Sequence, residues 1–401
     1  MSLRRSPRFI AILVVVTALG PLSMQMFLPA LPLIQRDFAT DTGTAQLALT
    51  AAMLAIGVAT LVYGPLSDRF GRRPVLLAGL VLFALGSAVS ALAPSVAVLI
   101  VGRVLQSAGA SAGIVIARAM ARDVYGPEQA IRVVSYLTMA MVVAPMIAPA
   151  LGGAVTDAFG WRVVFHLMIG VGALALAYVA FGLVETNRTA GEGGWRALAA
   201  NSRRLLGLRR FWGYSLATSL SVAVFFAFLA AAPYLTVETL KRPAREYGFW
   251  FMPVAGAFIV GTFVSTRVIG RLGVDRVIWL GAAATALAVG ATALIYLAWA
   301  LTPALLFAPA VAISFLQGFV IANAQGSAIN LDPRAAGAAS GLTGFIQMVL
   351  CSIVAQAVGM LNDGTVWPMM AFMIAAALAG LLVLPLMRAP AEPLPRAPGA
   401  A

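Results

Sequence analysis

The sequence predicts an all-α polytopic membrane protein with twelve transmembrane helices in two six-helix halves. Three observations lead to this fold class. Of the 401 residues, 61% are hydrophobic and only 10% are charged, whereas soluble globular chains are roughly 45–50% apolar and about 25% charged. The apolar residues form runs long enough to cross a lipid bilayer, and one long polar break divides them near the middle. This composition excludes a cytosolic enzyme, a disordered chain and a nucleic-acid-binding protein.

Each membrane-spanning helix needs about 20 mostly apolar residues. The first run follows three arginines and imitates a signal peptide, but it is too long for one, so we expect it to remain as the first span. The Ala93-Pro94-Ser95 turn separates the third span from the fourth. The twelve predicted spans are 9–33, 44–63, 75–93, 95–117, 131–155, 162–184, 212–235, 247–268, 275–299, 303–329, 336–360 and 366–387.

The distribution of basic residues predicts the topology. An even number of spans places both termini on one side of the membrane. With cytoplasmic termini, 21 of the 27 Lys and Arg residues fall on cytoplasmic segments, five fall on outer segments, and Arg103 lies within a span. The reverse topology would violate the positive-inside rule, so we predict that both termini are cytoplasmic. The net charge of +13 then reports topology and requires no nucleic-acid partner.

The polar break at 185–210 predicts how the chain is divided. It contains Gly191, Gly193, Gly194 and six arginines and is expected to be a cytoplasmic linker. It separates an N-terminal half, 1–184, from a C-terminal half, 211–387, whose equal spans suggest duplication. The proline-rich tail, 388–401, is expected to be disordered. The only cysteine, Cys351, excludes an intramolecular disulfide and a cysteine metal site, and we expect no cofactor.

A charged loop after the second span carries the most specific signal. It reads GPLSDRFGRRP over 64–74, and a worn copy, GRLGVDR, occupies the corresponding loop at 270–276. Its glycines permit a tight crossover between helices, and its single carboxylate can pair across the loop or with a helix N-terminus. Such a cluster can hold one conformation and release it in another. The candidate residues are Gly64, Asp68, Arg69, Gly71, Arg72 and Arg73.

This loop resembles the signature loop of the major facilitator superfamily. Two further elements also resemble that superfamily: an R-x-x-Q-x-x-G pattern from Arg103 to Gly109, and an antiporter motif in the fifth span. The antiporter residues are Pro145, Pro149, Gly152 and Gly153, with Ala144 where a glycine is usual. The first half resembles the Bcr/CflA group, named for bicyclomycin and chloramphenicol resistance. The resemblance implies a bacterial inner-membrane exporter of small-molecule drugs, driven by proton antiport through alternating access, and we expect a monomer.

Several residues are candidates for lining the transport cavity. Arg103 should face protein or a watery cavity, because a buried arginine costs at least about 2.5–3.5 kcal/mol on insertion scales. The resemblance implies that spans 1, 4, 7 and 10 line the path. Interhelical hydrogen bonding remains the alternative for the polar candidates, and packing for the aromatic ones. The candidates are Gln25, Arg103, Gln106, Phe225, Phe226, Asn323, Ser327 and Gln347.

Gln25 departs from the group, because an aspartate is expected at this position. Glutamine does not titrate, so proton coupling must use another group or be absent. Asp157, Asp37 and His166 are the candidates for such rerouting. No acidic residue falls well inside a predicted span, so the cavity should be neutral or positive. Neutral, amphenicol-like or anionic compounds should be better substrates than lipophilic cations.

Two other functions remain open. The same fold could carry an endogenous metabolite, with different coupling or none. A polytopic membrane enzyme would need paired carboxylates or a metal set near the membrane interface. A nucleotide-driven pump is disfavoured because no G-x-x-x-x-G-K-[ST] sequence occurs.

Overall fold

The computed structural model describes residues 7–187, 194–332 and 335–388, which are almost entirely helical. Twelve helical segments are long and apolar enough to cross a membrane, in agreement with the predicted fold class. The elements are α1 (Pro7–Phe27), η1 (Leu28–Ala30), α2 (Leu31–Asp37), α3 (Thr42–Phe70), α4 (Arg72–Ala91), α5 (Val96–Phe159), α6 (Arg162–Gly182), α7 (Trp195–Leu206), α8 (Arg209–Tyr234), η2 (Leu235–Thr239), α9 (Ala244–Leu272), α10 (Val274–Ala298), α11 (Pro303–Asn330), α12 (Ala336–Met360), α13 (Trp367–Val383) and η4 (Leu384–Arg388).

Several spans are longer than the apolar runs that predicted them. The first span continues through α1, η1 and α2 as far as Asp37. The fourth and fifth spans together form α5, whose helical backbone is interrupted at Gly126. The segment between the predicted spans 95–117 and 131–155 is therefore largely helical, because charged residues at the ends of a helix still complete its backbone hydrogen bonds.

Single glycines make the sharpest turns between consecutive helices. Gly71, Gly126, Gly160 and Gly273 have φ values of 96°, 75°, 84° and 79°. With ψ values near 150–170°, these conformations are essentially restricted to glycine. Gly71 and Gly273 occupy matching positions in the two charged loops, and they adopt the same backbone turn.

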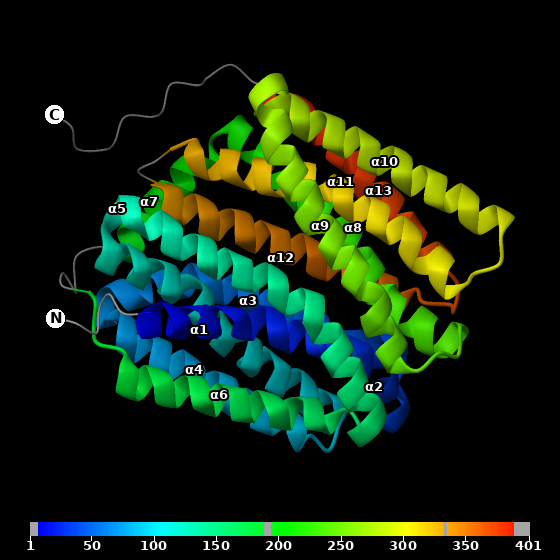
Figure 1. The fold of residues 1–401 in the computed structure, drawn as a ribbon, viewed down its shortest axis with the longest axis horizontal. Coiled ribbons are helices and arrows are strands. Elements are labelled where there is room, and N and C mark those ends of the chain that lie inside the picture. The colour runs from blue at the N-terminus through cyan, green and yellow to red at the C-terminus, as the bar shows by residue number, and fades with distance from the viewer. Residues whose placement is uncertain (1–6, 188–193, 333–334, 389–401) are drawn as a thin grey trace.

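Consecutive spans run in opposite directions, so the molecule has two ends (Figure 1). We call the end where α1 begins, and where the turns at Gly71 and Gly273 lie, the terminal end. We call the opposite end, which carries the turn at Gly160 and the loops around 38–41, 240–243 and 361–366, the distal end.

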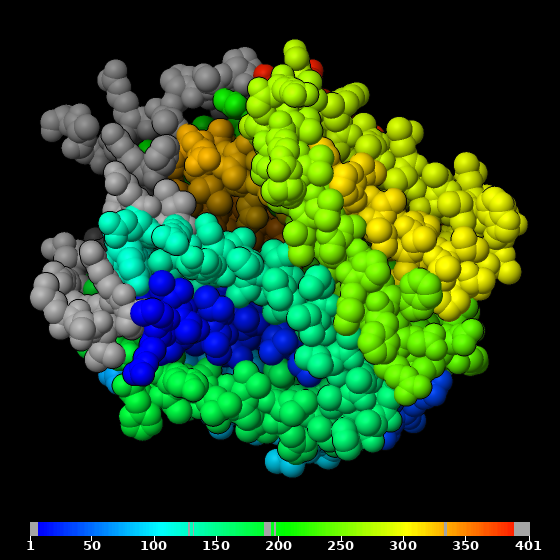
Figure 2. Space-filling model, in the orientation of Figure 1, coloured from blue at the N-terminus to red at the C-terminus, as the bar shows by residue number. Residues whose placement is uncertain are grey.

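The first six spans and the last six pack as two groups that meet along two helix pairs. A hydrophobic cluster built around Leu13, Leu76 and Phe83 lies wholly within the first group. The groups meet where α3 contacts α12 and where the second span of α5 contacts α9. In Figure 2, α5 (cyan to green) and α9 (yellow-green) touch near the distal end and diverge towards the terminal end, with α12 (orange) in the floor of the hollow. Nothing lies within 4 Å of a Cβ built on Gly256 of α9 or Gly344 of α12.

Candidate transport site and gates

Arg103 is buried inside the first group of helices and is 0% exposed. Its Nε donates to the carbonyl oxygen of Ala48 at 3.4 Å, and its Nη1 donates to Oε1 of Gln106. Gln106 in turn donates from Nε2 to Oγ of Ser87 at 2.8 Å. The guanidinium carbon lies 4.3 Å from the ring centroid of Phe27. The side chain of Arg103 therefore joins α5 to α1 and α3, Gln106 extends the connection to α4, and Arg103 faces protein.

Gln25 lies on α1 and is 7% exposed. Its Oε1 has no hydrogen-bond partner among the described residues. Every carboxylate in the described ranges lies in the first or last turn of a helical segment or outside the helices. Within these ranges, no group of three or more His, Cys, Asp or Glu side chains could hold a metal ion.

The remaining cavity candidates are distributed over the second group. Phe225 and Phe226 on α8 contact one another with ring centroids 6.3 Å apart, and Phe225 also contacts Phe251 of α9 at 6.0 Å. Asn323 of α11 donates from Nδ2 to Oγ of Ser265 at 2.7 Å, so it links α11 to α9.

Two of these candidates, Ser327 on α11 and Gln347 on α12, are half-buried. The direct contacts between predicted cavity residues join neighbours in the sequence: Arg103 contacts Gln106, and Phe225 contacts Phe226.

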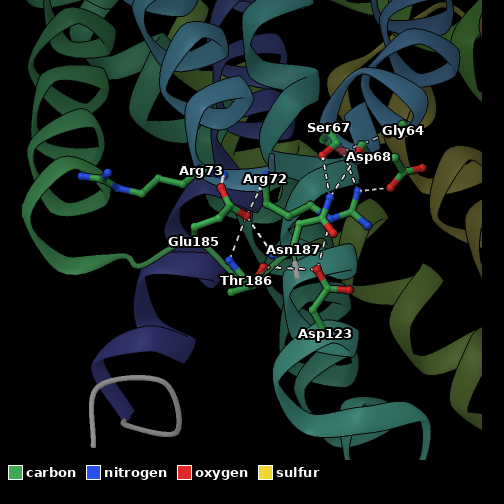
Figure 3. A network of polar contacts seen from close by, with 9 residues as sticks. All are labelled: Gly64, Ser67, Asp68, Arg72, Arg73, Asp123, Glu185, Thr186 and Asn187. Carbon is green, nitrogen blue, oxygen red and sulfur yellow. Dashed lines mark hydrogen bonds and ion pairs between the residues drawn. The ribbon is translucent and has the colours of Figure 1, made fainter. Parts of the chain in front are cut away.

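The charged loop of the first group forms a connected polar network (Figure 3). Asp68 pairs with Arg72 at 2.5 Å across the turn at Gly71. Arg72 also pairs from Nε with Asp123 of α5 at 3.1 Å and donates from Nη1 to Oγ of Ser67 at 2.7 Å. One arginine thus ties the end of α3 to the end of the first span of α5.

The other motif residues have different surroundings. Arg73 donates from Nη2 to the carbonyl oxygen of Ala180 on α6 at 2.7 Å. Arg69 lies over the ring of Phe70, with its guanidinium carbon 5.1 Å from the centroid. Nothing lies within 4 Å of a Cβ built on Gly64. The tight crossover therefore depends on Gly71, and the space at Gly64 does not require a glycine.

Glu185, which follows α6, completes this network, and the motif alone did not reveal it. Its two carboxylate oxygens accept the backbone N–H groups of Arg72 and Arg73 at 3.0 Å each, and those of Thr186 and Asn187 at 2.8 Å each. Partial burial opposes ionisation of Glu185, but these four N–H groups prevail and lower its pKa. The sequence held one signal for this acceptor. A helix that begins after glycine has no side-chain oxygen at its N-cap, so the first N–H groups of α4 need an acceptor from elsewhere in the chain.

Two neighbours of Glu185 extend the network. Asn187 donates from Nδ2 to the carbonyl oxygen of Asp68 at 2.9 Å, and Thr186 donates from Oγ1 to Asp123 at 3.2 Å. The segment 185–187 therefore binds the end of α3, the start of α4 and the end of the first span of α5 (Figure 3).

The corresponding loop of the second group shares the turn but not the charges of the first. Asp275 accepts a hydrogen bond from the hydroxyl of Tyr214 at 2.7 Å. Arg271 and Arg276 are exposed. Gly270 occupies the position of Asp68, so the carboxylate that pairs across the first turn has no counterpart in the second.

Glycines of the antiporter motif bring α5 close to two other helices. A Cβ on Gly152 would collide with the backbone of Met26 on α1, and one on Gly153 would lie 2.6 Å from the carbonyl oxygen of Ala244. Gly248 makes the matching close approach on α9, because a Cβ there would collide with the backbone of Ala150. Pro145 and Pro149 precede this close approach on α5.

Polar contacts between the two groups gather at the distal end, and we call this set of contacts the distal gate. Arg36 pairs with Glu238 at 2.7 Å. Asp157 accepts the backbone N–H groups of Ala244 and Arg245 at 3.1 and 2.9 Å. The remaining hydrogen bonds of the gate are Thr50 Oγ1 to Gln356 Oε1 at 2.6 Å, Gln356 Nε2 to the Gly43 carbonyl oxygen at 2.9 Å, Ser352 Oγ to the Thr50 carbonyl oxygen at 3.0 Å, and Asn362 Nδ2 to Thr42 Oγ1 at 3.3 Å.

The other two candidates for proton coupling make contacts within the first group. Asp37 accepts from Nη1 of Arg162 at 2.7 Å and from Nε1 of Trp161 at 3.0 Å. His166 places Nδ1 3.0 Å from the carbonyl oxygen of Arg162. Both lie near the distal end.

Comparison with known proteins places this architecture in a family. The family model described as Major Facilitator Superfamily matches residues 13–356. The bicyclomycin resistance protein homolog of Haemophilus influenzae is 28% identical over 93% of this chain and 94% of its own length. The chloramphenicol resistance protein of Pseudomonas aeruginosa is 31% identical over 90% of this chain and 85% of its own length.

A solved structure shows the same fold. It is a bacterial homolog of the human lysosomal transporter Spinster, in an inward-facing and occupied conformation. It aligns with a TM-score of 0.73 at 14% identity and covers 94% of this chain and 95% of the other. Since the family model matches most of the chain and twelve helices can span a membrane, the chain belongs to the major facilitator superfamily.

Proposed function

We propose that this protein exports small amphiphilic drugs across the bacterial inner membrane by alternating access. Members of the superfamily carry small molecules through a lipid bilayer, and relatives named for resistance to bicyclomycin, to chloramphenicol and to multiple drugs support export. The observation that carries the substrate class is the charge of the interior: Arg103 is buried there, and the described spans hold no internal carboxylate.

The orientation follows from charge. Under our proposal the terminal end faces the cytoplasm, where 21 of the 27 basic residues would lie. The hollow between α5 and α9 would then open towards the cytoplasm (Figure 2), and the distal gate would close the outer side. The two units that move would be the halves 1–184 and 211–387, within a single chain that works as a monomer.

The interior charge favours neutral, amphenicol-like and anionic substrates. A lipophilic cation in the hollow would find no carboxylate to offset the loss of its hydration, whereas aromatic side chains and amides suit a neutral amphiphile. Phe225, Phe226, Asn323 and Gln347 would supply these contacts. Strong export of ethidium by the wild-type protein would contradict this substrate class.

Coupling to protons is the second part of the proposal. Gln25 replaces the aspartate that the drug-exporter group leads us to expect, and an amide does not titrate near neutral pH. Antiport would then proceed through another group, for which Asp157, Asp37 and His166 are the candidates. The buried Oε1 of Gln25, which has no partner among the described residues, is available to accept a hydrogen bond from a bound substrate.

A liposome assay tests both parts. Purified wild type and Gln25→Asp would be compared for uptake of chloramphenicol and of ethidium, with and without a pH gradient. We expect wild type to transport chloramphenicol in preference to ethidium, and Gln25→Asp to gain or strengthen the response to the gradient. Failure of both proteins to move either compound would refute drug export.

One observation favours a second function. Because Gln25 removes the expected titrating group, the same fold could carry an endogenous metabolite without proton coupling. Drug transport that does not respond to a pH gradient in wild type, together with unchanged drug resistance after deletion of the gene, would support this alternative.

A further inference from the structure

Asp157 lies in the last turn of α5 and forms a cap on a helix of the other group. Its Oδ1 accepts the N–H of Ala244 at 3.1 Å, and its Oδ2 accepts the N–H of Arg245 at 2.9 Å. These are the first two residues of α9. The first N–H groups of a helix have no partner inside the helix, and a carboxylate placed there makes charge-assisted hydrogen bonds.

The sequence of α9 makes this external cap necessary. The residue before the helix is Pro243, which has no side-chain oxygen, and no side-chain cap is present at that position. Ser, Thr, Asp or Asn would normally fill this role from within the same chain segment. The start of α9 thus obtains its carboxylate acceptor from α5, across the boundary between the two groups of helices.

Close packing of α5 against the start of α9 keeps the Asp157 carboxylate near the N–H groups that it accepts. Asp157 lies four residues after Gly153, on the same face of α5. A Cβ on Gly153 would lie 2.6 Å from the carbonyl oxygen of Ala244, so α5 and the start of α9 are already close one turn earlier. Small outward movements of α9 at the distal end would therefore break both hydrogen bonds together.

Asp157 is exposed, so protons from the distal aqueous phase can reach it. The only other titratable side chain among the cross-group contacts described above is Glu238, which pairs with Arg36. Asp37 is held by Arg162 within the first group. The surrounding distal segments carry these other charged and titratable groups: Arg245 and Glu246 on α9, Lys241 and Arg242 in the preceding loop, Arg162 and His166 on α6, and Arg36 and Asp37 on α2.

We propose that Asp157 is a proton-sensitive latch of the distal gate. As a carboxylate it holds the start of α9 against α5 and keeps the gate closed. One proton taken from the distal side converts one acceptor oxygen to a hydroxyl, removes the negative charge from the helix N-terminus and weakens both hydrogen bonds, so the gate opens. Loss of the proton restores the latch.

This role differs from proton coupling, although it rests on the proposed alternating-access function. In antiport, the proton-loaded carrier must close on the outer side in order to return inward. Protonated Asp157 favours the opposite state, with the outer side open. Asp157 therefore sets how readily the distal gate opens. Under this proposal it leaves the set of coupling candidates named above, and Asp37 and His166 remain.

Distance measurements across the gate test the latch independently of transport. Cys351 is buried and would be replaced by serine. Leu92→Cys and Ala300→Cys would place spin labels on exposed distal loops of the first and the second group. In liposomes, we expect acidification to increase the distal-open fraction of the wild type. Asp157→Asn should raise the open-to-closed ratio about tenfold at neutral pH, since charge-assisted bonds are roughly twice as strong as neutral ones, and should abolish the response to pH.

Two further comparisons make the assignment specific. Glu238→Gln breaks the exposed pair with Arg36 and should leave the pH response intact. Arg245→Pro deletes one of the two donated N–H groups while keeping Asp157 charged, and proline is tolerated in the first turn of a helix. It should open the gate more than Arg245→Ala, which removes the same charge but keeps the N–H.

A distal distance that does not respond to pH in the wild type, or a response that survives in Asp157→Asn, would overturn the latch while leaving drug export standing. If the distal-open state is absent from every variant, even with chloramphenicol present, both the latch and alternating access are wrong. If the distance responds as expected but no drug moves in liposomes, the latch stands and the proposed substrate is wrong.

Discussion

Protein groups replace part of the hydration shell of Arg103 in the apolar interior, and its Nη2 has no hydrogen-bond partner among the described residues. The guanidinium lies over Phe27, donates to Ala48 and Gln106, and forms part of a chain that ends at Ser87. The planar guanidinium allows stacking and hydrogen bonding at the same time, which a lysine ammonium cannot reproduce.

We therefore expect Arg103→Lys to behave unlike a conservative substitution. The lysine should leave Gln106 without its donor and lose the stacking on Phe27, so transport of chloramphenicol should fall at least about tenfold, as when a charged hydrogen-bonding partner of ~1.5–3 kcal/mol is removed. Initial rates in liposomes at equal protein content would measure this. Ser87→Ala, at the far end of the chain of hydrogen bonds, is the matched control and should reduce the rate much less.

Glu185 links protonation to the stability of the charged loop. Its pKa in the folded protein is lowered from 4.5, so the carboxylate stabilises the folded state above that pH and loses this contribution as the pH falls through the folded pKa. Glu185→Gln should lower the free energy of unfolding by about 1–2 kcal/mol at neutral pH, reduced by partial solvent exposure.

Thermal unfolding of wild type and Glu185→Gln in detergent, at neutral pH and at a pH below 4.5, checks this prediction. The difference between the two proteins should shrink at the lower pH. A difference that is the same at both would show that the charge of Glu185 does not stabilise the loop.

For individual residues, the sequence predicted the chemical character of the interior better than it predicted which side chains contact one another. The absence of carboxylates from the interior and the isolation of Arg103 within a span could be read directly from residue types. Glu185 could not be assigned to the loop, because it lies more than 110 residues from Arg72 and only folding brings them together. Gly64 was expected to permit a close approach that occurs at Gly71 instead.

Among the structural elements, the two glycine turns of the charged loops offer a controlled comparison. Gly71 and Gly273 share the same backbone conformation, which costs of order 1–3 kcal/mol for a residue with a side chain. A Cβ on Gly71 would also lie 2.7 Å from Oε2 of Glu185, whereas nothing lies within 4 Å of one on Gly273.

Gly71→Ala should therefore destabilise the protein more than Gly273→Ala, by about 1 kcal/mol or more, since it also displaces a hydrogen-bonded carboxylate. Melting temperatures of the two variants in the same detergent would measure the difference. Equal losses would mean that backbone strain alone determines both effects, and that Glu185 adjusts to the methyl group without cost.

The contact between α5 and α9 depends on Gly248. A methyl group there would collide with the backbone of Ala150, whereas one on Gly256 of the same helix meets nothing within 4 Å. Gly248→Ala should thus push the two helices apart and increase the reactivity of Ala244→Cys, a buried distal position, towards a membrane-impermeant maleimide in a Cys351→Ser background. Gly256→Ala should leave the reactivity unchanged. Equal reactivity in the two variants would contradict a seam that keeps the gate closed.

The existence of each span was predictable, because a run of about 20 mostly apolar residues is visible in the sequence itself. The ends of the spans were not, because polar residues can complete a helix beyond the bilayer. This explains why α3 continues from the predicted end at 63 to Phe70, and why the fourth span continues from the predicted end at 117 to Gly126. The polar break at 185–210 contains a further helix, α7, which its arginines and glycines did not suggest.

Across the whole molecule, the two ends carry different kinds of contact. At the terminal end, the network of Asp68, Arg72, Asp123 and Glu185 joins helices within the first group. At the distal end, the gate joins one group to the other. Contacts distributed in this way would allow the two groups to move relative to each other with little change inside each group.

This arrangement predicts that a single covalent bond at the distal gate arrests transport. A Cβ on Gly359 of α12 would lie 2.8 Å from Cβ of Gln46 on α3, and disulfides need Cβ atoms about 3.5–4.5 Å apart. A small outward shift of α12 would therefore allow Gln46→Cys and Gly359→Cys to bond in a Cys351→Ser background. Gln46 is buried and neither of its amide atoms has a partner among the described residues, so its loss should be tolerated.

Oxidation of this pair should abolish transport, and reduction should restore it, because the two groups must separate at the distal end in every cycle. The matched control is Gly20→Cys with Ala110→Cys, which joins α1 to α5 within the first group. A Cβ on Gly20 would lie 3.7 Å from Cβ of Ala110, within the range that a disulfide needs. Oxidation of this control pair should leave most of the transport rate, since that contact need not open. If oxidation at positions 46 and 359 forms the disulfide, as a gel shift would show, and transport nevertheless continues, the distal gate does not open during transport.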